Sequence, residues 1–413
     1  MSFLNVSRMM CWLVASVCIC LSHDAFAQGA DIRILKDGAN KKITIDVSAS
    51  GSSSKAAAVR AVLFEDLKRS GWFVPAPSAS ASFLVSLNVA GAGDQLTAHV
   101  QVARNGGAGT LLSKTFTASK GDERWLAHQI ADAIVWKIKK RPGIAATRIL
   151  MVGQRSNRKD LYLCDYDGHG LRQITRDGVP CHSPSWGATA FEVYYTSPYA
   201  GFPDIYRIDL KTRNRARVAK YPGLNAGAAI SPDGRSIAMI LSKDGNPELY
   251  VQDIRSQRLQ RMTTTRHAAE ASPSWSPDGG AIVYVSDTTG APQLYIVSRN
   301  GGRARRLTTP ARHGSENVSP DWGPDGTIVC ASRRNRRYQL MQIDPDGGNN
   351  TLLTTGHADH EEPSWARDGR HIVYVKTVGY KESLYILDTM GDPEIALTRF
   401  PGEWYSPAWS RFE

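Results

Sequence analysis

The sequence is poor in cysteine, and this excludes a fold held together by disulfides. Only six of the 413 residues are cysteine, and three of them lie near the amino terminus, which leaves Cys164, Cys181 and Cys330. So few cysteines cannot form the dense framework of bridges found in small secreted domains. Cys164 and Cys181 form either a disulfide or two free thiols. The distance and direction of their side chains decide between these, and both depend on strand geometry that the sequence does not give. Cys330 lies in an apolar run and is expected to pack in the core.

The sequence also lacks the motifs of the common enzyme classes. It contains no Gly-x-Ser-x-Gly elbow, no His-Glu-x-x-His pair and no P-loop. The most metal-like cluster, residues 357–362, lies in a predicted loop rather than on a helix that would align two imidazoles. Residues 165–168 and 344–348 contain paired carboxylates but too few ligands for an EF-hand loop. We therefore expect no catalytic residue, no cofactor and no metal.

Long apolar runs are missing everywhere except at the amino terminus. Residues 9–21 form an uncharged apolar run, which is shorter than the ~20 residues that span a bilayer. Arg8 precedes this run, and Ala25 and Ala27 supply the small residues of a cleavage site. This pattern is typical of a signal peptide. It predicts a signal peptide over residues 1–27, cleaved near Ala27, and a periplasmic mature chain without membrane insertion; a permanent anchor is the alternative.

Basic residues exceed acidic ones. The formal net charge is +11, and removal of residues 1–27 leaves it unchanged because one Arg and one Asp are lost. Many of the arginines occur in three clusters: Arg213, Arg215 and Arg217; Arg303, Arg305 and Arg306; Arg333, Arg334, Arg336 and Arg337. They indicate either an acidic partner or anionic surface, or edge strands protected by charge. Nucleic acid is not expected for an exported chain without a nucleic-acid-binding module.

The sequence is rich in an internal repeat. Six segments align on one apolar position, at spacings of 44, 45, 47, 43 and 44 residues: Trp186, Ile230, Trp275, Trp322, Trp365 and Trp409. Most of them contain Ser-Pro-x-Trp, and four continue into an Asp-Gly turn. A period in the forties with several strands per unit is typical of a β-propeller blade.

Each unit predicts four antiparallel strands. The Trp strand is followed by a Pro-Asp-Gly-type turn, in which Pro presets φ and Gly accepts a positive φ. A second strand, such as residues 282–286, precedes a third built on a Leu-Tyr pair, such as Leu294-Tyr295. The fourth is expected to end in a Leu-Thr pair, such as Leu307-Thr308. Such a small sheet is stable only when it is stacked against neighbours.

The two ends of the repeat predict how the ring closes. The first unit begins at residues 149–152 without a Trp strand before it, while the last Trp strand, residues 406–410, has no strands after it. If the last strand completes the first unit, residues 144–413 form a closed six-bladed β-propeller. An ion in the central channel of such a ring stays an open alternative.

Residues 28–143 differ in composition and predict a small α/β domain. Residues 31–35 and 43–47 are expected strands, and residues 96–102 alternate apolar and polar side chains as a half-buried strand does. Residues 56–69 and 126–138 have helical spacing. The second helix ends in basic residues 137–141, which act either as a favourable helix terminus or as a docking patch.

The whole pattern resembles a known family. Six Ser-Pro-x-Trp-Ser-Pro-Asp-Gly-like repeats, each followed by Ile-x-Tyr-Val-Ser-like and Leu-Tyr strands, are similar to those of the TolB family, the periplasmic component of the Tol-Pal envelope system. The signal peptide and the small α/β domain fit the same family. The repeat alone is also similar to propellers attached to prolyl-oligopeptidase-like hydrolases, but no hydrolase domain is expected here.

The resemblance implies a scaffold that supports outer-membrane integrity and constriction during division. In that family the loops that lead into the Trp strands bind the peptidoglycan-associated lipoprotein Pal. By position, those loops here contain Leu224, Asn225, Ala226, Glu270, Ala271, Ser272, Glu316, Asn317, Glu361 and Glu362. Their carboxylates predict an acidic rim on a basic protein.

The resemblance also implies a TolA-like inner-membrane partner for the N-terminal strand. That strand contains Asp31, Ile32, Arg33, Ile34 and Leu35. We expect a monomer. Two alternatives stay open: a TolB-like paralogue with another partner, and a periplasmic propeller that uses its channel, where Asp321 is the main acidic candidate, to bind or convert a ligand.

Overall fold

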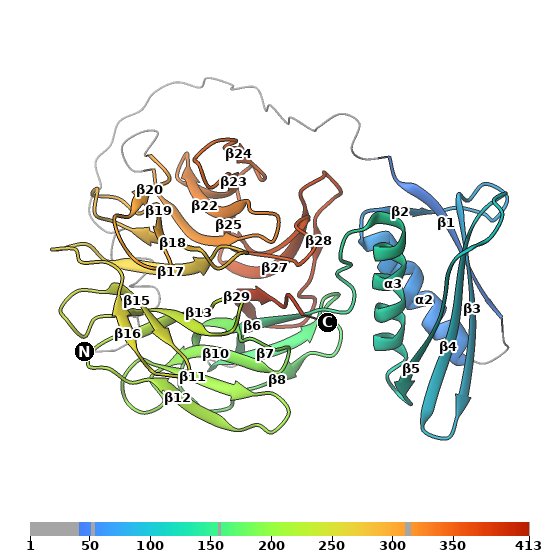
Figure 1. Ribbon diagram of the computed structural model, residues 1–413, viewed down its shortest axis with the longest axis horizontal. Helices are drawn as coiled ribbons and strands as arrows, with labels where there is room; N and C mark the ends of the chain where they lie inside the picture. Colours follow the sequence, from blue (N-terminus) through green and yellow to red (C-terminus); the bar gives the residue numbers. More distant parts are fainter. Residues whose placement is uncertain (1–40, 51–53, 156–157, 310–314, 413) are drawn as a thin grey trace.

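The computed structural model describes residues 41–412 apart from 51–53, 156–157 and 310–314 (Figure 1). The predicted fold class is confirmed, since a smaller α/β part precedes a β-propeller of six four-stranded sheets. The predicted signal peptide, residues 1–27, and the predicted strand from Asp31 to Leu35 lie outside the described residues. No helix in the described ranges is long and apolar enough to cross a membrane.

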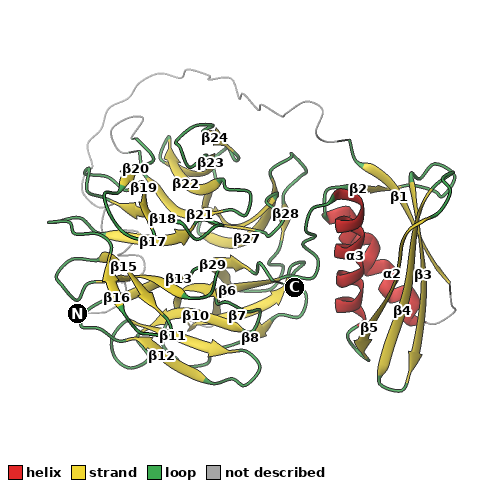
Figure 2. Cartoon of the chain, viewed as in Figure 1, coloured by secondary structure: helices red, strands yellow, loops and turns green. Residues whose placement is uncertain are grey.

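The N-terminal part is a five-stranded sheet with two helices on one face (Figure 2). Its strand order is β2-β1-β3-β4-β5. The elements are β1 (Ile43–Ser50), α2 (Ser54–Arg69), β2 (Phe73–Pro75), β3 (Phe83–Ala92), β4 (Gln95–Arg104), β5 (Thr110–Ser119) and α3 (Glu123–Lys139). The predicted strands and helices within residues 43–138 agree with these elements. The apolar face of each helix is buried, for example Leu63 on α2 and Ile130 on α3, and the helices lie between their sheet and the propeller (Figure 1).

The propeller consists of six sheets, numbered here in chain order of their innermost strands. Blade 1 comprises β9 (His182–Trp186), β10 (Glu192–Ser197), β11 (Asp204–Asp209) and β12 (Arg215–Ala219). Blade 2 comprises β13 (Asn225–Ile230), β14 (Ser236–Leu241), β15 (Glu248–Asp253) and β16 (Leu259–Arg261). Blade 3 comprises β17 (Glu270–Trp275), β18 (Ala281–Ser286), β19 (Gln293–Ser298) and β20 (Arg305–Arg306).

The other three blades have the same order. Blade 4 comprises β21 (Asn317–Trp322), β22 (Ile328–Arg334), β23 (Arg337–Ile343) and β24 (Thr351–Leu352). Blade 5 comprises β25 (Asp359–Trp365), β26 (His371–Val378), β27 (Lys381–Asp388) and β28 (Ile395–Ala396). Blade 6 comprises β29 (Glu403–Trp409), β6 (Arg148–Arg155), β7 (Arg158–Asp165) and β8 (Arg172–Gln173).

Blade 6 joins the two ends of the propeller. The last strand, β29, pairs antiparallel with β6, so that Trp409 lies opposite Ile149. The Trp409 indole Nε1 donates a hydrogen bond of 2.7 Å to Thr147 Oγ1, and the backbone N–H of Ser410 donates to the Arg148 carbonyl at 2.8 Å. Strands far apart in the sequence thereby form one sheet, which closes the ring without leaving an open blade.

Every inner strand contains one residue in the left-handed conformation. The six residues stand three positions before the aligned Trp or Ile, with φ between 43° and 65°: Ser183, Gly227, Ser272, Ser319, Glu362 and Ser406. The register of each inner strand shifts at this point, as in a β-bulge. A positive φ in a residue other than Gly costs on the order of 1–3 kcal/mol and persists only where the surroundings impose it.

The Leu-Thr pairs have a different place from the one predicted. They were expected to end the outer strands, but β8, β16, β20, β24 and β28 all stop before them. Instead each Thr Oγ1 accepts a hydrogen bond from the backbone N–H of the Leu or equivalent 14 residues earlier, as Thr308 does from Leu294 at 2.9 Å. Leu307 N–H in turn donates to the Leu294 carbonyl at 2.7 Å. The pair therefore ties the end of the outer strand to the start of the third strand.

The three cysteines are buried thiols. Cys164 and Cys181 do not form a disulfide, and the Cys181 thiol lies 3.5 Å from the Lys159 carbonyl oxygen. Burial raises the pKa of both thiols. Cys330 packs in the apolar core between blades 3 and 4, as expected.

Candidate partner-binding face

The propeller has two faces, defined by the direction of its inner strands. We call the face where the inner strands begin the start face, and the face with the Asp-Gly turns after them the turn face. The N-terminal part docks on the turn face. Arg141 pairs with Asp325 at 3.1 Å, the Arg367 Nε donates to the Gly143 carbonyl at 2.6 Å, and Arg370 Nη2 donates to the Gly71 carbonyl at 3.1 Å. The basic end of α3 thus contributes an ion pair to the docking.

A buried hydrogen-bond network joins α2 and α3 to blade 6. Asp66 bonds His128 Nδ1 and accepts from the Tyr166 hydroxyl, both at 2.7 Å. Burial opposes charging of His128, but the hydrogen bond and the charge of Asp66 outweigh it and raise the pKa of His128. Asp167 lies close to Asp66 and His128. Within the described ranges, these three residues form the one group of side chains that could together hold a metal ion. The Asp167 carboxylate is bound to Arg124 of α3, which makes a second link between the N-terminal part and blade 6.

The predicted start-face residues Asn225, Glu270 and Asn317 occupy equivalent positions and are all buried. The backbone N–H of each donates to a Pro carbonyl of the preceding blade, as Glu270 does to Pro247 at 2.9 Å. The Asn225 amide also donates to Asp204 Oδ1 at 3.2 Å. These side chains therefore connect neighbouring blades instead of projecting to solvent.

The predicted acidic rim is only partly exposed. Glu270 and Glu316 are buried, and Glu316 is bound by Arg333 Nη1 at 2.8 Å and by the Tyr338 hydroxyl. Glu361 and Glu362 are half-buried, and Glu362 Oε2 accepts from the Ser406 backbone N–H at 2.6 Å. The expectation of a strongly acidic rim is wrong for Glu270, which begins β17 and is buried in the seam between blades 2 and 3, and for Glu316, which is buried and paired with Arg333 of its own blade.

The remaining members of the predicted set differ in exposure. Ser272 is exposed, Leu224 and Ala271 are half-buried, and Ala226 is buried. The structure brings the set together on one face but leaves only part of it accessible to a partner.

Exposed aromatic side chains lie on the same face and were not found from the sequence. In each blade the second strand starts at the turn face and ends at the start face, so its following turn lies on the start face. The turn between β10 and β11 presents Tyr199 and Phe202, which is 72% exposed, and the turn between β26 and β27 presents Tyr380, which is 99% exposed. Loop residues carry no periodic signal, and only their aromatic character in a turn could have indicated them.

Asp321 is the main acidic candidate of the alternative in which the channel binds or converts a ligand. Its carboxylate is bound by neighbouring protein groups. Its Oδ2 accepts from the Trp365 backbone N–H at 2.7 Å, and its Oδ1 lies 3.2 Å from Ser274 Oγ and 3.0 Å from Arg411 Nη2. Arg411 follows the last strand and also donates to the Trp322 carbonyl at 2.8 Å. Asp321 thus links blades 3, 4 and 5 and has a cationic partner.

The residues of the metal-like cluster bind protein groups. Asp359 accepts from Arg337 Nη1 and from the Tyr338 backbone N–H, both at 2.8 Å. His360 is buried against the Tyr374 ring, and burial followed by the charge of Lys376 lowers its pKa. The arrangement stabilises blades 4 and 5.

The arginine clusters are partly neutralised. Arg215 pairs with Asp177, Arg217 with Asp204 and Arg333 with Glu316. Arg305 and Arg306 form the exposed outer strand of blade 3, where charge discourages pairing with another chain. The clusters therefore combine ion pairing within the fold with protection of its edges.

Comparisons with known proteins decide the family. A family model described as the TolB beta propeller domain (PD40) matches residues 136–413. The chain belongs to the TolB β-propeller family. It is 34% identical over 139 residues to the Tol-Pal system protein TolB of Alcanivorax borkumensis, covering 33% of this chain and 32% of the relative. It is 27% identical over 183 residues to the protein of the same name from Desulfosudis oleivorans, covering 44% of this chain and 42% of the relative.

The TolB likeness extends to a solved structure. The crystal structure of TolB from Acinetobacter baumannii matches with a TM-score of 0.78 and 26% identity, covering 89% of this chain and 96% of that one. A structure of putative TolB from Agrobacterium tumefaciens, at 20% identity and a TM-score of 0.51, shares the fold over 62% of this chain and 90% of that one. The sequence alignments span less than half of the curated TolB relatives, whereas the structural match spans almost the whole A. baumannii chain.

Proposed function

We propose that this protein is a periplasmic scaffold of the Tol-Pal type that binds a Pal-like peptidoglycan-associated lipoprotein through its start face. The observation that carries the proposal is the position of the N-terminal part. It docks on the turn face through Arg141, Arg367 and Arg370, which leaves the opposite mouth of the ring available to a partner. Exposed aromatic side chains there, Phe202 and Tyr380, are the type that anchors protein interfaces.

The partner contact in this proposal uses the accessible members of the predicted set. These are Leu224, Ala271, Ser272, Glu361 and Glu362. The buried members, Asn225, Ala226, Glu270, Glu316 and Asn317, hold the underlying strands in place. The face then works through side chains mounted on a rigid ring, which lowers the entropy lost on binding.

The proposal assigns a second partner to the N-terminal region. A TolA-like inner-membrane protein would engage the strand that contains Asp31, Ile32, Arg33, Ile34 and Leu35. The protein acts as a monomer without catalysis, cofactor, nucleic acid or membrane insertion, and it supports outer-membrane integrity and constriction in cell division.

Binding of the mature chain to purified lipoproteins tests the proposal. We expect saturable 1:1 binding to a peptidoglycan-associated lipoprotein without its lipid, measured by calorimetry. Phe202→Asp places a charge on the start face and should weaken binding at least tenfold. Arg258→Asp, on the exposed outer edge of blade 2, is the matched control and should bind as the wild type does.

Two outcomes would contradict the proposal. One is the absence of binding by the correctly folded wild type, and the other is an equal loss of affinity in Phe202→Asp and Arg258→Asp. Deletion of residues 28–40 should leave lipoprotein binding intact and abolish binding of a TolA-like periplasmic domain.

A further inference from the structure

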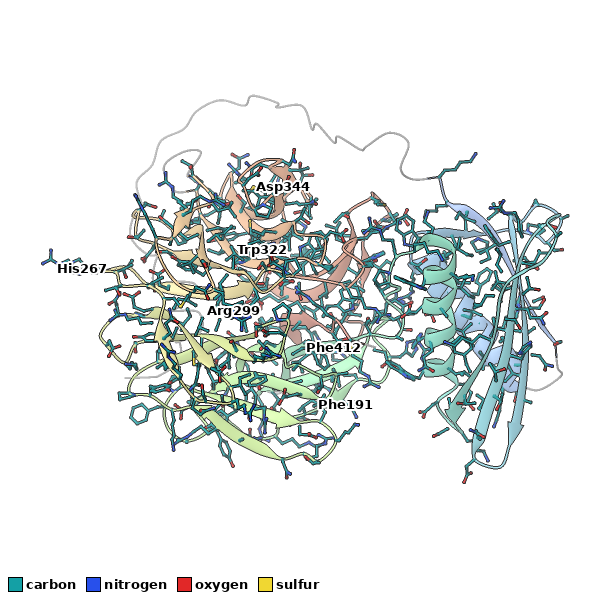
Figure 3. All side chains as sticks on the ribbon, in the orientation of Figure 1. Phe191, His267, Arg299, Trp322, Asp344 and Phe412 are labelled. Atoms are coloured by element: carbon teal, nitrogen blue, oxygen red, sulfur yellow. The ribbon has the colours of Figure 1, made fainter. Side chains whose placement is uncertain are left out.

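The seam between blades 2 and 3 places two acidic side chains where the two neighbouring seams place an amide and its acceptor. Between blades 1 and 2, the Asn225 amide donates to Asp204 at 3.2 Å. Between blades 3 and 4, the Asn317 amide donates to Gln293 Oε1 at 2.9 Å. In the seam between blades 2 and 3, the residue equivalent to the asparagines is Glu270; it begins β17, just after the loop with His267 (Figure 3).

Glu248 stands where Asp204 and Gln293 stand in the other seams, and its surroundings favour a negative charge. It is fully buried. Its Oε1 accepts from Arg261 Nη2 at 3.1 Å and from the Thr265 backbone N–H at 2.5 Å. Its Oε2 has no hydrogen-bond partner among the described residues. One oxygen of the Glu248 carboxylate is therefore held by donors, while the other is an unused acceptor site.

Glu270 has no cationic partner among the described residues. It is 1% exposed, and neither of its carboxyl oxygens has a hydrogen-bond partner in the described part of the chain. Its backbone N–H donates to the Pro247 carbonyl, which places it next to Glu248. Burial raises the pKa of Glu270 to about 8; Glu248 and Asp287 add to the rise and the nearby Ser286 hydroxyl opposes it.

We propose that Glu270 and Glu248 share one proton, with a neutral Glu270 carboxyl donating to the free Oε2 of Glu248. The proton then takes the place that an amide N–H of Asn225 or Asn317 has in the two neighbouring seams. Among the described residues, the charged and titratable groups around the pair are Asp244, Tyr250 and Arg261 from blade 2 and Asp287 and Tyr284 from blade 3. Arg261 is the one cation among them and is bound to Glu248, so loss of the proton leaves two buried anions facing each other.

This pair makes the ring sensitive to alkaline pH at one seam. Between the ordinary glutamate pKa of 4.5 and about 8, the folded protein binds more protons than the unfolded chain, so its stability falls as the pH rises. The contribution of one group reaches about a tenfold change in the unfolding equilibrium constant per pH unit. Above pH 8 both states have lost the proton and the decline from Glu270 ends.

Variants at Glu270 test the energetic consequence. Glu270→Gln retains the shape and supplies a permanent N–H donor, so it should be more stable than the wild type at pH 8.5 and its stability should decline less steeply between pH 5 and 8. Glu316→Gln removes another buried carboxylate, which is already paired with Arg333, and should keep the wild-type decline. Equal pH slopes in wild type and Glu270→Gln, measured by urea unfolding, would overturn the proposal.

A spectroscopic measurement on the wild-type protein tests the proton itself and does not depend on the stability of a variant. The infrared spectrum at pH 7.5 should contain the carbonyl band of a protonated carboxylic acid, which disappears by pH 9.5; burial raises the pKa of Asp132 only to about 6, so that carboxyl is ionised at both pH values. Difference spectra should show this band in Glu316→Gln and lack it in Glu270→Gln. Absence of the band at pH 7.5, or its persistence at that pH in Glu270→Gln, would contradict the shared proton.

Discussion

Replacement of Arg370 is the sharpest test of how the two parts of the protein are joined. This guanidinium is buried on blade 5. Its Nε donates to Asp388 Oδ1 at 2.9 Å and its Nη2 to Asp388 Oδ2 at 2.6 Å. The same Nη2 donates to the Gly71 carbonyl, and the guanidinium lies 4.3 Å from the centroid of the Trp72 ring. One propeller side chain thus binds a carboxylate of its own blade and two residues of the N-terminal part.

We expect Arg370→Met to destabilise the protein strongly. The substitution leaves Asp388 as a buried carboxylate without its main partner, which typically costs about 3–5 kcal/mol. Loss of the cation–π contact with Trp72 adds roughly 0.5–2 kcal/mol. Methionine refills part of the volume, so the lower half of this range is expected. At ~1.4 kcal/mol per factor of ten, the unfolding equilibrium constant rises by about two to four orders of magnitude.

Urea unfolding followed by tryptophan fluorescence measures this change. Arg399→Met, an exposed arginine between blades 5 and 6, is the control and should change the free energy of unfolding by less than ~0.5 kcal/mol. Gly71→Ala should also be destabilising, because a Cβ there would lie 2.2 Å from Arg370 Nη2. In the Arg370→Met background the cost of Gly71→Ala should shrink. A cost below ~1 kcal/mol for Arg370→Met, or strict additivity of the two substitutions, would refute this account.

Three further predictions follow from the packing. Thr308→Val removes the acceptor of the buried Leu294 N–H and should cost about 1–3 kcal/mol in urea unfolding; no loss would contradict the role given to the Leu-Thr pairs. The raised pKa of His128 adds stability below pH 6.5 that is lost as the pH rises through that pKa; the stability difference between wild type and His128→Gln should be larger at pH 6 than at pH 8.5, and a constant difference would contradict it. Cys164 and Cys181 should be fully alkylated in denaturant without reductant, as intact mass measures, and unreactive in the native state; resistance to alkylation in denaturant would indicate a disulfide.

The closed ring of six blades could be predicted from the sequence because the signals for its strands and turns are local and repeated. Turn residues with fixed conformational preferences recur at a nearly constant spacing, and the unmatched first and last units require a shared sheet. The pairing of β29 with β6 follows from this strand count, whereas its register came from the structure. The helices of the N-terminal part were predictable for a related reason, since helical spacing of apolar residues is also a local signal.

The left-handed residues of the inner strands could not be predicted from local sequence signals. Ser272 and Glu362 precede Pro, a position that favours extended backbone, and both have φ of 50°. The bulge results from the fit of each inner strand to its neighbours in the ring. It therefore depends on contacts that no single repeat contains.

The direction of the first side chain in each inner strand could not be predicted from the sequence either. A carboxylate before a strand suggests an exposed loop, but Glu270 points into a seam because its strand begins at that residue. A shift of one residue in the start of a strand moves a side chain to the other face. The accessible part of the candidate face, with Phe202 and Tyr380, consequently came from the structure.

Site-specific photo-crosslinking in living cells tests the central claim most directly. A photoreactive amino acid is placed at Phe202 or Ser272 on the start face, and at Arg303 on the outer edge of blade 3 as a control; all three positions are exposed. The account predicts a crosslink to a peptidoglycan-associated lipoprotein from Phe202 and Ser272 and none from Arg303. A crosslink to that lipoprotein from Arg303 alone, or no crosslink to it from either start-face position, would contradict the claim that this face binds the partner.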